Sequence, residues 1–309
     1  MNKVLIIGTG SIAKKHAINL HSLKYKIYIF SASKNKIILN NKKININYIY
    51  NLDNLKDFKF AVLANDTNKH LSILTILIKK KINVYCEKPI TNKKFDYANI
   101  RKKIIQNKIL IFTGYQLLQH EKIQYLKKII SKEKILSFNL EVGHDYKKWR
   151  KGTLKKNSYF LNQNKGGGVI FELIHEINLI QNLIGNIDYI KTFKKKSDKK
   201  YKFEDLAISI LKVKNIIGSL HQDMISPQLY RRIKILTKNR LFILDIANNT
   251  LHINNKELMI SDTDNSHMSL LKKNLIFFIN LINKKKNTIK YFDQSVNDLK
   301  ITLKMHSSI

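Results

Sequence analysis

The chain has 309 residues, of which 44% are hydrophobic and 9% aromatic, and its formal net charge is +35 at pH 7. This hydrophobic content excludes a disordered chain, and the length allows two domains with full cores. The charge is compatible with nucleic-acid binding, because dense positive charge binds polyanions by releasing counterions. The lysines are scattered rather than gathered in a tail. We therefore expect a solvated basic surface without a specific nucleic-acid partner.

The cysteine content and the hydropathy of the sequence indicate the cellular compartment of the protein. Cys86 is the single cysteine, so no internal disulfide can form, and its place at the end of an apolar run indicates a packed thiol. No stretch is apolar over the length needed to cross a bilayer, and the N-terminus enters a strand without a signal peptide. We expect a cytoplasmic protein with no membrane span.

The first expected element is a buried strand over residues 4–7, which leads through a glycine turn into a helix. Gly8, Gly10 and Ala13 have the spacing GxGxxA, in which the glycines allow a tight turn and the close approach of a pyrophosphate to the helix N-terminus. An ordinary strand–turn–helix is the alternative. The predicted cofactor contacts of this turn are Gly8, Gly10, Ser11, Ile12 and Ala13.

The carboxyl end of the next expected strand, residues 25–30, bears on the choice of dinucleotide. An acidic residue there would bind the adenosine ribose 2′-hydroxyl of NAD. The chain instead has Ser31, Ser33 and Lys34, and hydroxyls with a cation suit a 2′-phosphate. We therefore expect NADP as the preferred cofactor, with NAD as the alternative, and these three residues among its contacts.

Strands and helices alternate through the rest of the first half. Further strands are expected at residues 46–50, 60–64, 84–85 and 109–113, with helices up to about residue 80 and at 95–106. This alternation predicts an α/β fold with a doubly wound parallel sheet, the Rossmann arrangement. We expect the dinucleotide-binding domain to span residues 1–117.

In the second half of the chain, strands and helices no longer alternate regularly. A helix at residues 121–131 and a strand at 136–142 precede a long polar loop, after which GGGVIFELIHEINLIQNLIG indicates one amphipathic helix that Gly185 ends. Several strands with short turns follow between residues 189 and 251, which predicts a mainly antiparallel sheet. Helices are expected at about 268–284 and 296–306. Residues 118–309 would form a substrate-binding and oligomerisation domain.

Three separated motifs resemble one family. They are IGTGSIAKKHAINL, which includes His16, then VYCEKPI, and GGGVIFELIHEI; the C-terminal DLKITLKMHSS is also similar. In this order they resemble the Gfo/Idh/MocA oxidoreductases over essentially the whole chain. The resemblance implies a Rossmann domain followed by an α/β domain with an open, mainly antiparallel sheet. It also implies an NAD(P)-dependent enzyme and an exposed sheet face that makes homodimers or homotetramers.

Lys88 is the first candidate catalytic residue. A lysine at the carboxyl edge of a Rossmann sheet lies where nicotinamide and substrate meet, and its ammonium group can hydrogen-bond the reacting oxygen. A surface lysine is the default alternative in so basic a chain, but the flanking Glu87 and Pro89 complete the EKP signature. The resemblance implies a cis Lys88–Pro89 bond. We place Glu87 with the cofactor, and Lys88 with both cofactor and substrate.

His175 is the second candidate. Its imidazole can take a hydroxyl proton as hydride leaves, or return it in the reductive direction. A core histidine satisfied by hydrogen bonds is the alternative. Glu172 and Asn178 lie three residues before and after it, so a polar cluster shares its helical face. Many family members have an aspartate four residues before this histidine, whereas this chain has Glu172, to which we assign catalytic and substrate contacts.

The remaining candidates come from turns and the long loop. Asn65, Asp66 and Thr67 replace a Thr-Pro-Thr-like segment beside the cofactor, and Leu118 replaces a common arginine. Trp149 and Arg150 open a loop that resembles a subgroup associated with bacterial surface-polysaccharide and sugar biosynthesis. The tryptophan could stack on a sugar or pack at a rim, and the arginine could pair with a phosphate or carboxylate. We also count His70 with the cofactor, and Tyr115, Trp149 and Arg150 with the substrate.

The histidines at positions 70, 120, 144 and 221 have no metal-ligand spacing together with Cys86, so we expect no metal site. The leading hypothesis is a dehydrogenase or reductase that transfers a hydride between nicotinamide and a sugar or nucleotide-sugar carbon, in bacterial surface-glycan biosynthesis. A non-catalytic NAD(P)- and sugar-binding regulator or scaffold on the same fold is the alternative. Its partners would be a small-molecule sugar and further copies of the chain.

Overall fold

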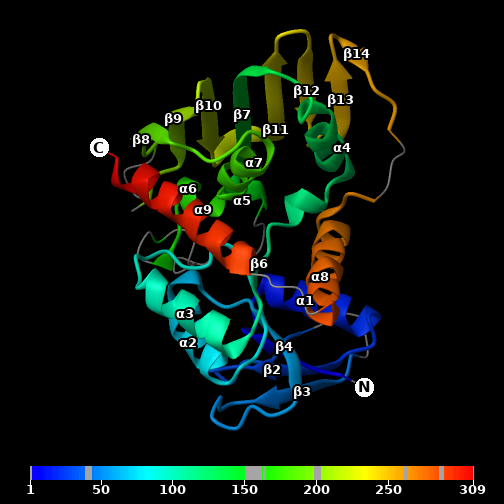
Figure 1. Ribbon diagram of the computed structural model, residues 1–309. Coiled ribbons are helices and arrows are strands. Elements are labelled where there is room, and N and C mark those ends of the chain that lie inside the picture. The colour runs from blue at the N-terminus through cyan, green and yellow to red at the C-terminus, as the bar shows by residue number, and fades with distance from the viewer. Residues whose placement is uncertain are drawn as a thin grey trace. The chain divides into compact units, whose positions relative to one another are not determined.

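The computed structural model describes residues 2–38, 44–149, 162, 165–197, 203–260, 264–284 and 289–308. The chain divides into two compact units. Unit 1 comprises Met1–Gln116 and Ser266–Asn297, and unit 2 comprises Leu117–Asn265 and Asp298–Ile309. Figure 1 labels the elements of both units.

Unit 1 contains a parallel sheet of six strands. In sequence order they are β1 (Lys3–Ile7), β2 (Lys26–Phe30), β3 (Ile46–Ile49), β4 (Phe58–Leu63), β5 (Val84–Cys86) and β6 (Ile111–Thr113). In space the order is β3-β2-β1-β4-β5-β6, and every neighbouring pair is parallel. The predicted doubly wound Rossmann sheet is therefore confirmed, and the switch point of the sheet lies between β1 and β4.

Helices cover this sheet. They are α1 (Ser11–Ser22), α2 (His70–Lys79) after a short 3-10 turn at Thr67–Lys69, α3 (Tyr97–Asn107) and α8 (His267–Asn283). Asp96 begins α3 as an N-cap, because its side chain accepts a hydrogen bond from the Asn99 amide. Apolar residues of α1 and α8 join those of the strands in one core, so these two helices cover the same face of the sheet.

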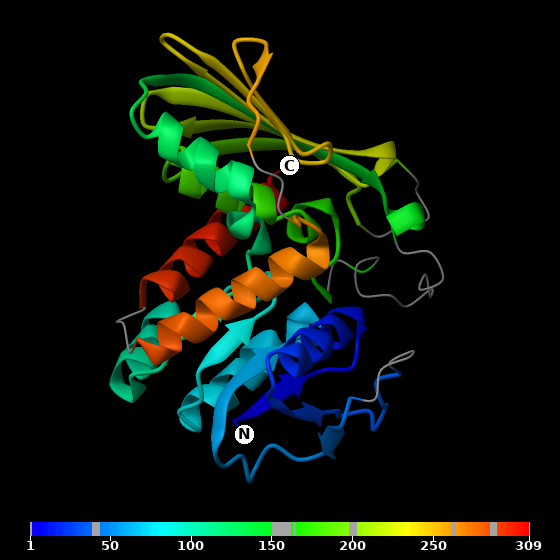
Figure 2. The ribbon, with the colours of Figure 1, turned by 90° about the vertical axis from the view of Figure 1, so that its right-hand side faces the viewer.

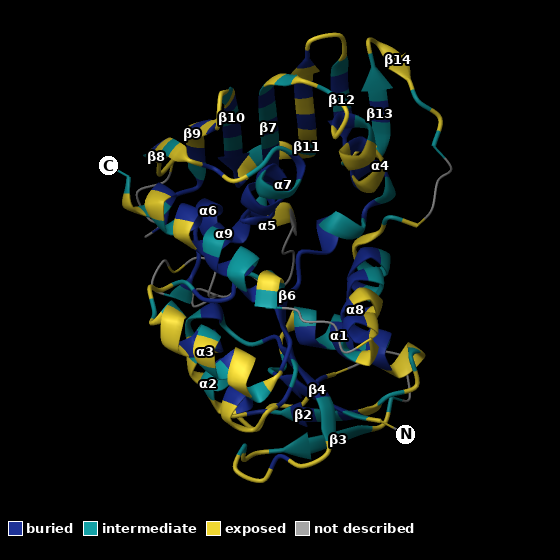
Figure 3. Cartoon of the chain, viewed as in Figure 1, coloured by how far each residue is buried: buried dark blue, intermediate teal, exposed yellow. Residues whose placement is uncertain are grey.

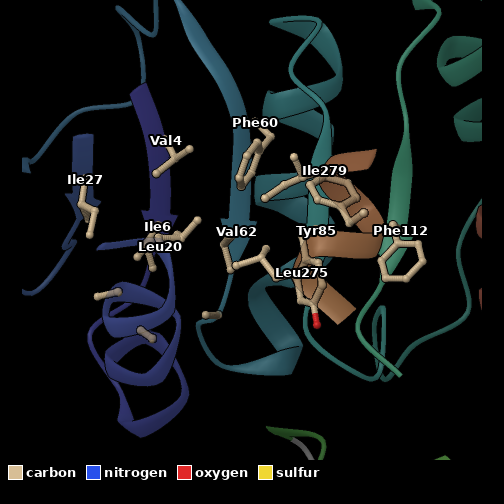
Figure 4. Packing of buried hydrophobic residues seen from close by; sticks show 14 of the residues in the cluster. Val4, Ile6, Leu20, Ile27, Phe60, Val62, Tyr85, Phe112, Leu275 and Ile279 are labelled. Atoms are coloured by element: carbon tan, nitrogen blue, oxygen red, sulfur yellow. The ribbon is translucent and has the colours of Figure 1, made fainter. Parts of the chain in front are cut away.

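Helix α8 belongs to unit 1, whereas the sequence led us to expect residues 266–297 in the second domain. The Phe278 ring packs edge-on against Phe60 and Tyr85, with ring centroids 5.2 and 5.6 Å away. Leu275 and Ile279 lie in the same core, as Figure 4 shows. The apolar stripe of a helix indicates that it is buried but not which sheet buries it, so the periodicity of residues 268–284 could not assign the unit.

Unit 2 contains a sheet of eight strands. They are β7 (Ile135–Asp145), β8 (Tyr189–Lys195), β9 (Leu206–Val213), β10 (Ile216–Asp223), β11 (Ile225–Thr237), β12 (Leu241–Asp245), β13 (Thr250–Ile253) and β14 (Lys256–Glu257). Their order is β14-β13-β12-β11-β7-β10-β9-β8. Only β10 and β7 pair in parallel among these neighbours. The predicted mainly antiparallel sheet is confirmed.

The helices of unit 2 lie on one side of this sheet (Figure 2). They are α4 (Glu121–Ile130), α5 (Tyr146–Trp149), α6 (Val169–Glu172), α7 (His175–Leu183) and the second part of α9 (Ile289–Ser307), and a 3-10 turn at Gln116–Gln119 precedes them. Strand β9 alternates between buried and exposed residues, which is the pattern of a sheet with one covered face. Figure 3 shows this alternation on the strands. Within the described ranges, no helix is long and apolar enough to span a membrane.

Candidate functional site

Gly8 makes the turn at the end of β1. Its φ of +113° lies in the region that favours glycine, and a Cβ atom there would be 2.8 Å from the Ala64 carbonyl oxygen. The Gly8 amide donates a hydrogen bond to the Phe30 carbonyl oxygen over 3.1 Å. The turn is therefore held between the ends of β2 and β4, at the switch point of the sheet.

Gly10 leaves the start of α1 open. A Cβ atom at Gly10 would meet no atom of the described residues within 4 Å, so these residues do not require glycine here. As the N-cap of α1, Gly10 offers no side-chain hydrogen bond, and the first turn of the helix has no acidic residue. Ala13, in contrast, is fully buried in the core of unit 1. Uncapped amides with open space above them fit a dinucleotide pyrophosphate.

The residues expected at a 2′-phosphate follow β2, and they differ in how far their side chains are exposed. The Ser31 side chain is buried, and its hydroxyl donates a hydrogen bond to the Asn35 carbonyl oxygen over 2.8 Å. Ser33 and Lys34 are exposed. Ser31 thus supports the turn, and Ser33 and Lys34 are the groups that remain available to an anion.

The segment after β4 lies close to the exit of β5. Asn65 and Asp66 are half-buried and Thr67 is buried. His70 is 1% exposed; its Nδ1 atom lies 3.0 Å from the Pro89 carbonyl oxygen and its Nε2 atom 3.0 Å from the Asn65 carbonyl oxygen. His70 therefore connects the turn after β4 with the EKP segment.

Glu87 is buried against α1. The His16 Nε2 atom lies 2.6 Å from the Glu87 Oε1 atom, and the His16 side chain is fully buried. Burial opposes ionisation of the carboxyl, but the hydrogen bond from His16 and the nearby charges of His16 and Lys88 outweigh it and lower the pKa of Glu87. The carboxylate is thus a buried anion next to the candidate lysine.

Lys88 is half-buried at the carboxyl edge of the sheet, and the Lys88–Pro89 bond is cis, as the resemblance implied. Burial raises the pKa of the preceding Cys86 thiol well above its ordinary value, and this agrees with a packed, unreactive cysteine. Sequence reasoning did not find His267, at the start of α8. Its Nδ1 atom lies 3.3 Å from the Lys15 Nζ atom, and no sequence motif indicated this pairing.

The glycine-rich turn of unit 2 precedes α6. Gly168 has a φ of +101°, in the region that favours glycine, and a Cβ atom there would lie 2.4 Å from the Oε1 atom at the end of the Glu204 side chain. The Val169 amide donates to the Glu204 carbonyl oxygen over 2.9 Å. The turn therefore fixes the start of the segment that carries Glu172 and His175, whose side chains are both buried.

This segment is two short helices, α6 and α7, where the sequence predicted one. The Leu173 carbonyl oxygen accepts a hydrogen bond from the Gln222 side chain of β10 over 2.7 Å. That bond satisfies the backbone where the helix is interrupted, between Glu172 and His175. At the other end, Gly185 has a φ of +138° and follows the end of α7, so the predicted stop is confirmed.

Asn178, which we expected to share a polar cluster with His175, contacts α9. Its side-chain amide donates to the Asp298 Oδ2 atom over 2.8 Å, and Gln181 donates to the Asp298 Oδ1 atom over 2.5 Å. Asp298 is fully buried. Asn178 therefore has a structural partner that no local sequence pattern indicated.

The structure describes only some of the other residues that we expected to contact the substrate. Tyr115 is buried two residues after the end of β6. Trp149 ends α5, but its side chain and all of Arg150 lie outside the described residues, as does most of the loop that follows. In the described part of the chain, no group of three or more histidine, cysteine or acidic side chains could hold a metal ion.

The parallel sheet, the glycine turn and the uncapped helix define the first unit as a dinucleotide-binding Rossmann domain. Residues 2–114 match the model of the Gfo/Idh/MocA family, which is described as an oxidoreductase family with an NAD-binding Rossmann fold. This match covers the parallel sheet and stops before unit 2.

Several solved structures share the fold over nearly the whole chain. UDP-N-acetylglucosamine 3-dehydrogenase GnnA from Acidithiobacillus ferrooxidans has a TM-score of 0.84 at 16% identity, covering 100% of this chain and 97% of its own. Levoglucosan dehydrogenase in complex with NADH has a TM-score of 0.81 at 13% identity, covering 99% and 96%. An oxidoreductase domain protein from Kribbella flavida has 0.85 at 12% identity, covering 99% and 97%.

At these identities the likeness shows the fold alone. No curated protein sequence matches the chain.

Proposed function

We propose that this chain is an NAD(P)-dependent oxidoreductase of the Gfo/Idh/MocA family that interconverts an alcohol and a carbonyl on a sugar or nucleotide sugar. One observation carries the proposal. The uncapped start of α1 at Gly10 and the segment Glu87–Lys88–Pro89 both follow strands of the same parallel sheet, at its carboxyl edge. This is the edge where doubly wound sheets bind ligands.

The glycine turn would hold the cofactor. The α1 amides bind the pyrophosphate, Gly8 and Gly10 allow its approach, and Ser33 and Lys34 bind a 2′-phosphate. The segment Asn65–Thr67, with Ser11 and Ile12, completes the contacts. A bound nicotinamide dinucleotide supplies the redox chemistry, and NADP is preferred over NAD.

Lys88 would hydrogen-bond the oxygen of the reacting carbon. An ammonium group held at that oxygen stabilises the negative charge that develops when the alcohol loses its proton, and water exclusion strengthens this interaction. The residue before Lys88 in the sequence, Glu87, is a buried carboxylate whose pKa is lowered. Lys88 therefore contributes both position and charge.

His175 would exchange the hydroxyl proton. An imidazole titrates near neutral pH, so it can accept a proton in one direction and return it in the other. Glu172, buried in the preceding helix, would orient this ring. The interruption between α6 and α7 leaves His175 at the first position of α7, two residues after the Leu173 carbonyl oxygen that accepts a hydrogen bond from Gln222.

For the substrate class we propose a sugar, more specifically a nucleotide-activated or acidic one used in bacterial surface-glycan synthesis. Two relatives of the same fold are named as a UDP-N-acetylglucosamine dehydrogenase and a levoglucosan dehydrogenase. The net charge of +35 would attract an anionic nucleotide sugar. Trp149, Arg150 and Tyr115 are the proposed sugar and phosphate contacts. The proposed compartment is the cytoplasm, which would keep the thiol of Cys86 reduced.

The open face of the unit 2 sheet supports a homodimer or homotetramer. Its outward residues include large apolar side chains from neighbouring strands: Tyr189, Phe193, Ile208, Ile210, Ile217 and Leu236. Lys191 and Lys212 lie between them in the strand register, and exposed apolar side chains on an open sheet face favour a subunit interface. Light scattering should therefore give an oligomer for the wild type and a monomer for Ile208→Glu with Ile210→Glu. A monomeric wild type would contradict this assembly.

The experiment for the proposed activity follows absorbance at the nicotinamide band with a panel of sugars and nucleotide sugars, in both directions and with both cofactors. We expect turnover with at least one of them, and faster turnover with the NADP couple. Tight dinucleotide binding without turnover on any compound would instead favour the regulator or scaffold on the same fold.

A further inference from the structure

Two buried histidines bind the residues on either side of Lys88. His16 of α1 places its Nε2 atom 2.6 Å from the Oε1 atom of Glu87. His70, at the start of α2, places its Nδ1 atom 3.0 Å from the carbonyl oxygen of Pro89. The exposed fractions of the two histidines are 0% and 1%. The candidate lysine therefore lies between two residues, Glu87 and Pro89, that each contact a buried histidine.

The contact of His16 is directional. A carboxylate only accepts hydrogen bonds, so the Nε2–H group of His16 donates to Glu87. Within the described residues its other ring nitrogen is buried without a hydrogen-bond partner, so Glu87 is the one polar link of this ring there. The ring also packs edge-on against Tyr85, with centroids 5.1 Å apart. Glu87 is thereby tied to the helix that follows the glycine turn.

The contact of His70 joins two backbone segments. Its Nε2 atom lies 3.0 Å from the Asn65 carbonyl oxygen, while Nδ1 faces Pro89. A neutral imidazole carries one N–H group, so the ring donates to one of these two oxygens at a time. It lies between the turn after β4 and the exit of β5, both at the carboxyl edge of the sheet. Each histidine connects the EKP segment to a part of the chain that the proposed function assigns to the cofactor.

We propose that His16 and His70 are positioning residues that hold Lys88 in place for reaction, an inference that rests on the proposed function. Lysine has a long flexible side chain, so its ammonium group is only as well placed as the backbone that carries it. A displacement of about 1 Å at a reacting group can cost about 10²-fold in rate. Fixing the residues before and after Lys88 limits that displacement.

Matched variants separate positioning from packing. His16→Leu and His70→Leu remove the polar links, whereas His16→Gln and His70→Asn keep an amide donor near the lost ring nitrogen. We expect the leucine variants to lose about 10- to 100-fold in kcat at saturating cofactor, with the dissociation constant for NADPH changed less than about threefold. The amide variants should recover most of the loss. His21→Leu, an exposed residue of α1, is the control.

A second readout does not depend on turnover. Hydrogen–deuterium exchange of the peptide at residues 84–92 should be at least about tenfold faster in both leucine variants and close to wild type in both amide variants. Unchanged exchange overturns the inference, whether or not the enzyme turns over. Normal kcat in the leucine variants, when Lys88→Ala is inactive, also overturns it and leaves the proposed function standing. A wild type without turnover contradicts the proposed function instead.

Discussion

The hydroxyl of Tyr85 donates a hydrogen bond to the Asn274 Oδ1 atom over 2.8 Å, and both side chains are buried. The two residues are 189 positions apart in the sequence. This bond fixes α8 against the Rossmann sheet at the strand that leads to Lys88. Gly114 gives the Tyr85 ring its space, because a Cβ atom there would lie 2.4 Å from the hydroxyl oxygen.

Tyr85→Phe should therefore destabilise the protein. The substitution leaves the Oδ1 atom of Asn274 buried without its donor, which costs about 1–3 kcal/mol in free energy of unfolding. Urea unfolding measures this change. Tyr50→Phe, at a residue 49% exposed, is the control and should change stability by less than about 0.5 kcal/mol. Equal stability of the two variants would show that the bond contributes nothing.

Alanine substitutions at the two glycines of the first turn should change different properties of the protein, stability at Gly8 and cofactor affinity at Gly10. Gly8→Ala forces a side chain onto a φ of +113° and against the Ala64 carbonyl oxygen, so we expect a loss of stability of about 2 kcal/mol or more. The methyl group of Gly10→Ala meets no atom within 4 Å in the described part of the chain. This variant should keep its stability and weaken NADPH binding by about tenfold, because the added methyl group occupies the space of the pyrophosphate.

Thermal unfolding and calorimetric titration measure both effects on the same samples. Undiminished NADPH affinity in Gly10→Ala would contradict the placement of the pyrophosphate at the start of α1.

Lys34 should influence the choice of cofactor. It has a φ of +57°, so Lys34→Asn removes the cation with a residue that tolerates this conformation. We expect the dissociation constant for NADPH to rise by about tenfold, a loss of about 1.4 kcal/mol, while that for NADH stays unchanged. Lys24→Asn is matched, because Lys24 is exposed and has a φ of +61°. If both cofactors weakened equally, Lys34 would not contact a 2′-phosphate.

Stability should fall in mild acid through His70. Burial lowers its pKa from the ordinary value of 6.5, although the carbonyl oxygens of Asn65 and Pro89 and the charges of Glu87 and Asp66 oppose that shift. Below pH 6.5 the unfolded chain therefore binds this proton more readily than the folded chain. The free energy of unfolding should decrease as the pH falls from 6.5 towards the lowered pKa, by up to about 1.4 kcal/mol per pH unit.

His70→Asn removes this contribution, so its stability should depend less steeply on pH than that of the wild type. Urea unfolding at several values between about pH 5 and 7 measures the two slopes. Identical slopes would show that His70 takes up its proton equally in both states.

Local patterns were enough to predict the first half of the fold. The apolar run of β1, the spacing of Gly8 and Gly10, and the alternation of strands and helices depend on residues close in sequence, so the sequence alone predicts them. The sheet of unit 2 was predicted for the same reason. The GGG turn before α6 was expected, but the φ of +101° at Gly168, which favours glycine, is seen only in the structure.

The remaining features depend on distant partners. The Leu173 carbonyl oxygen at the helix interruption accepts a hydrogen bond from Gln222 on β10, and Phe278 of α8 packs against Phe60. The Glu87 carboxylate accepts a hydrogen bond from His16 of α1. None of these pairings leaves a periodic signal in the chain. The EKP motif indicated Lys88 as a candidate, but it did not indicate what holds that residue in place.

The rate of nicotinamide oxidation or reduction by Lys88→Ala, at saturating cofactor and with the substrate found for the wild type, tests the central proposal most directly. We expect kcat to fall by about 10²- to 10³-fold, while NADPH affinity stays within about threefold. Lys94→Ala, at an exposed lysine six positions later, should match the wild type. Full turnover by Lys88→Ala would contradict the assignment of this lysine to the reacting oxygen.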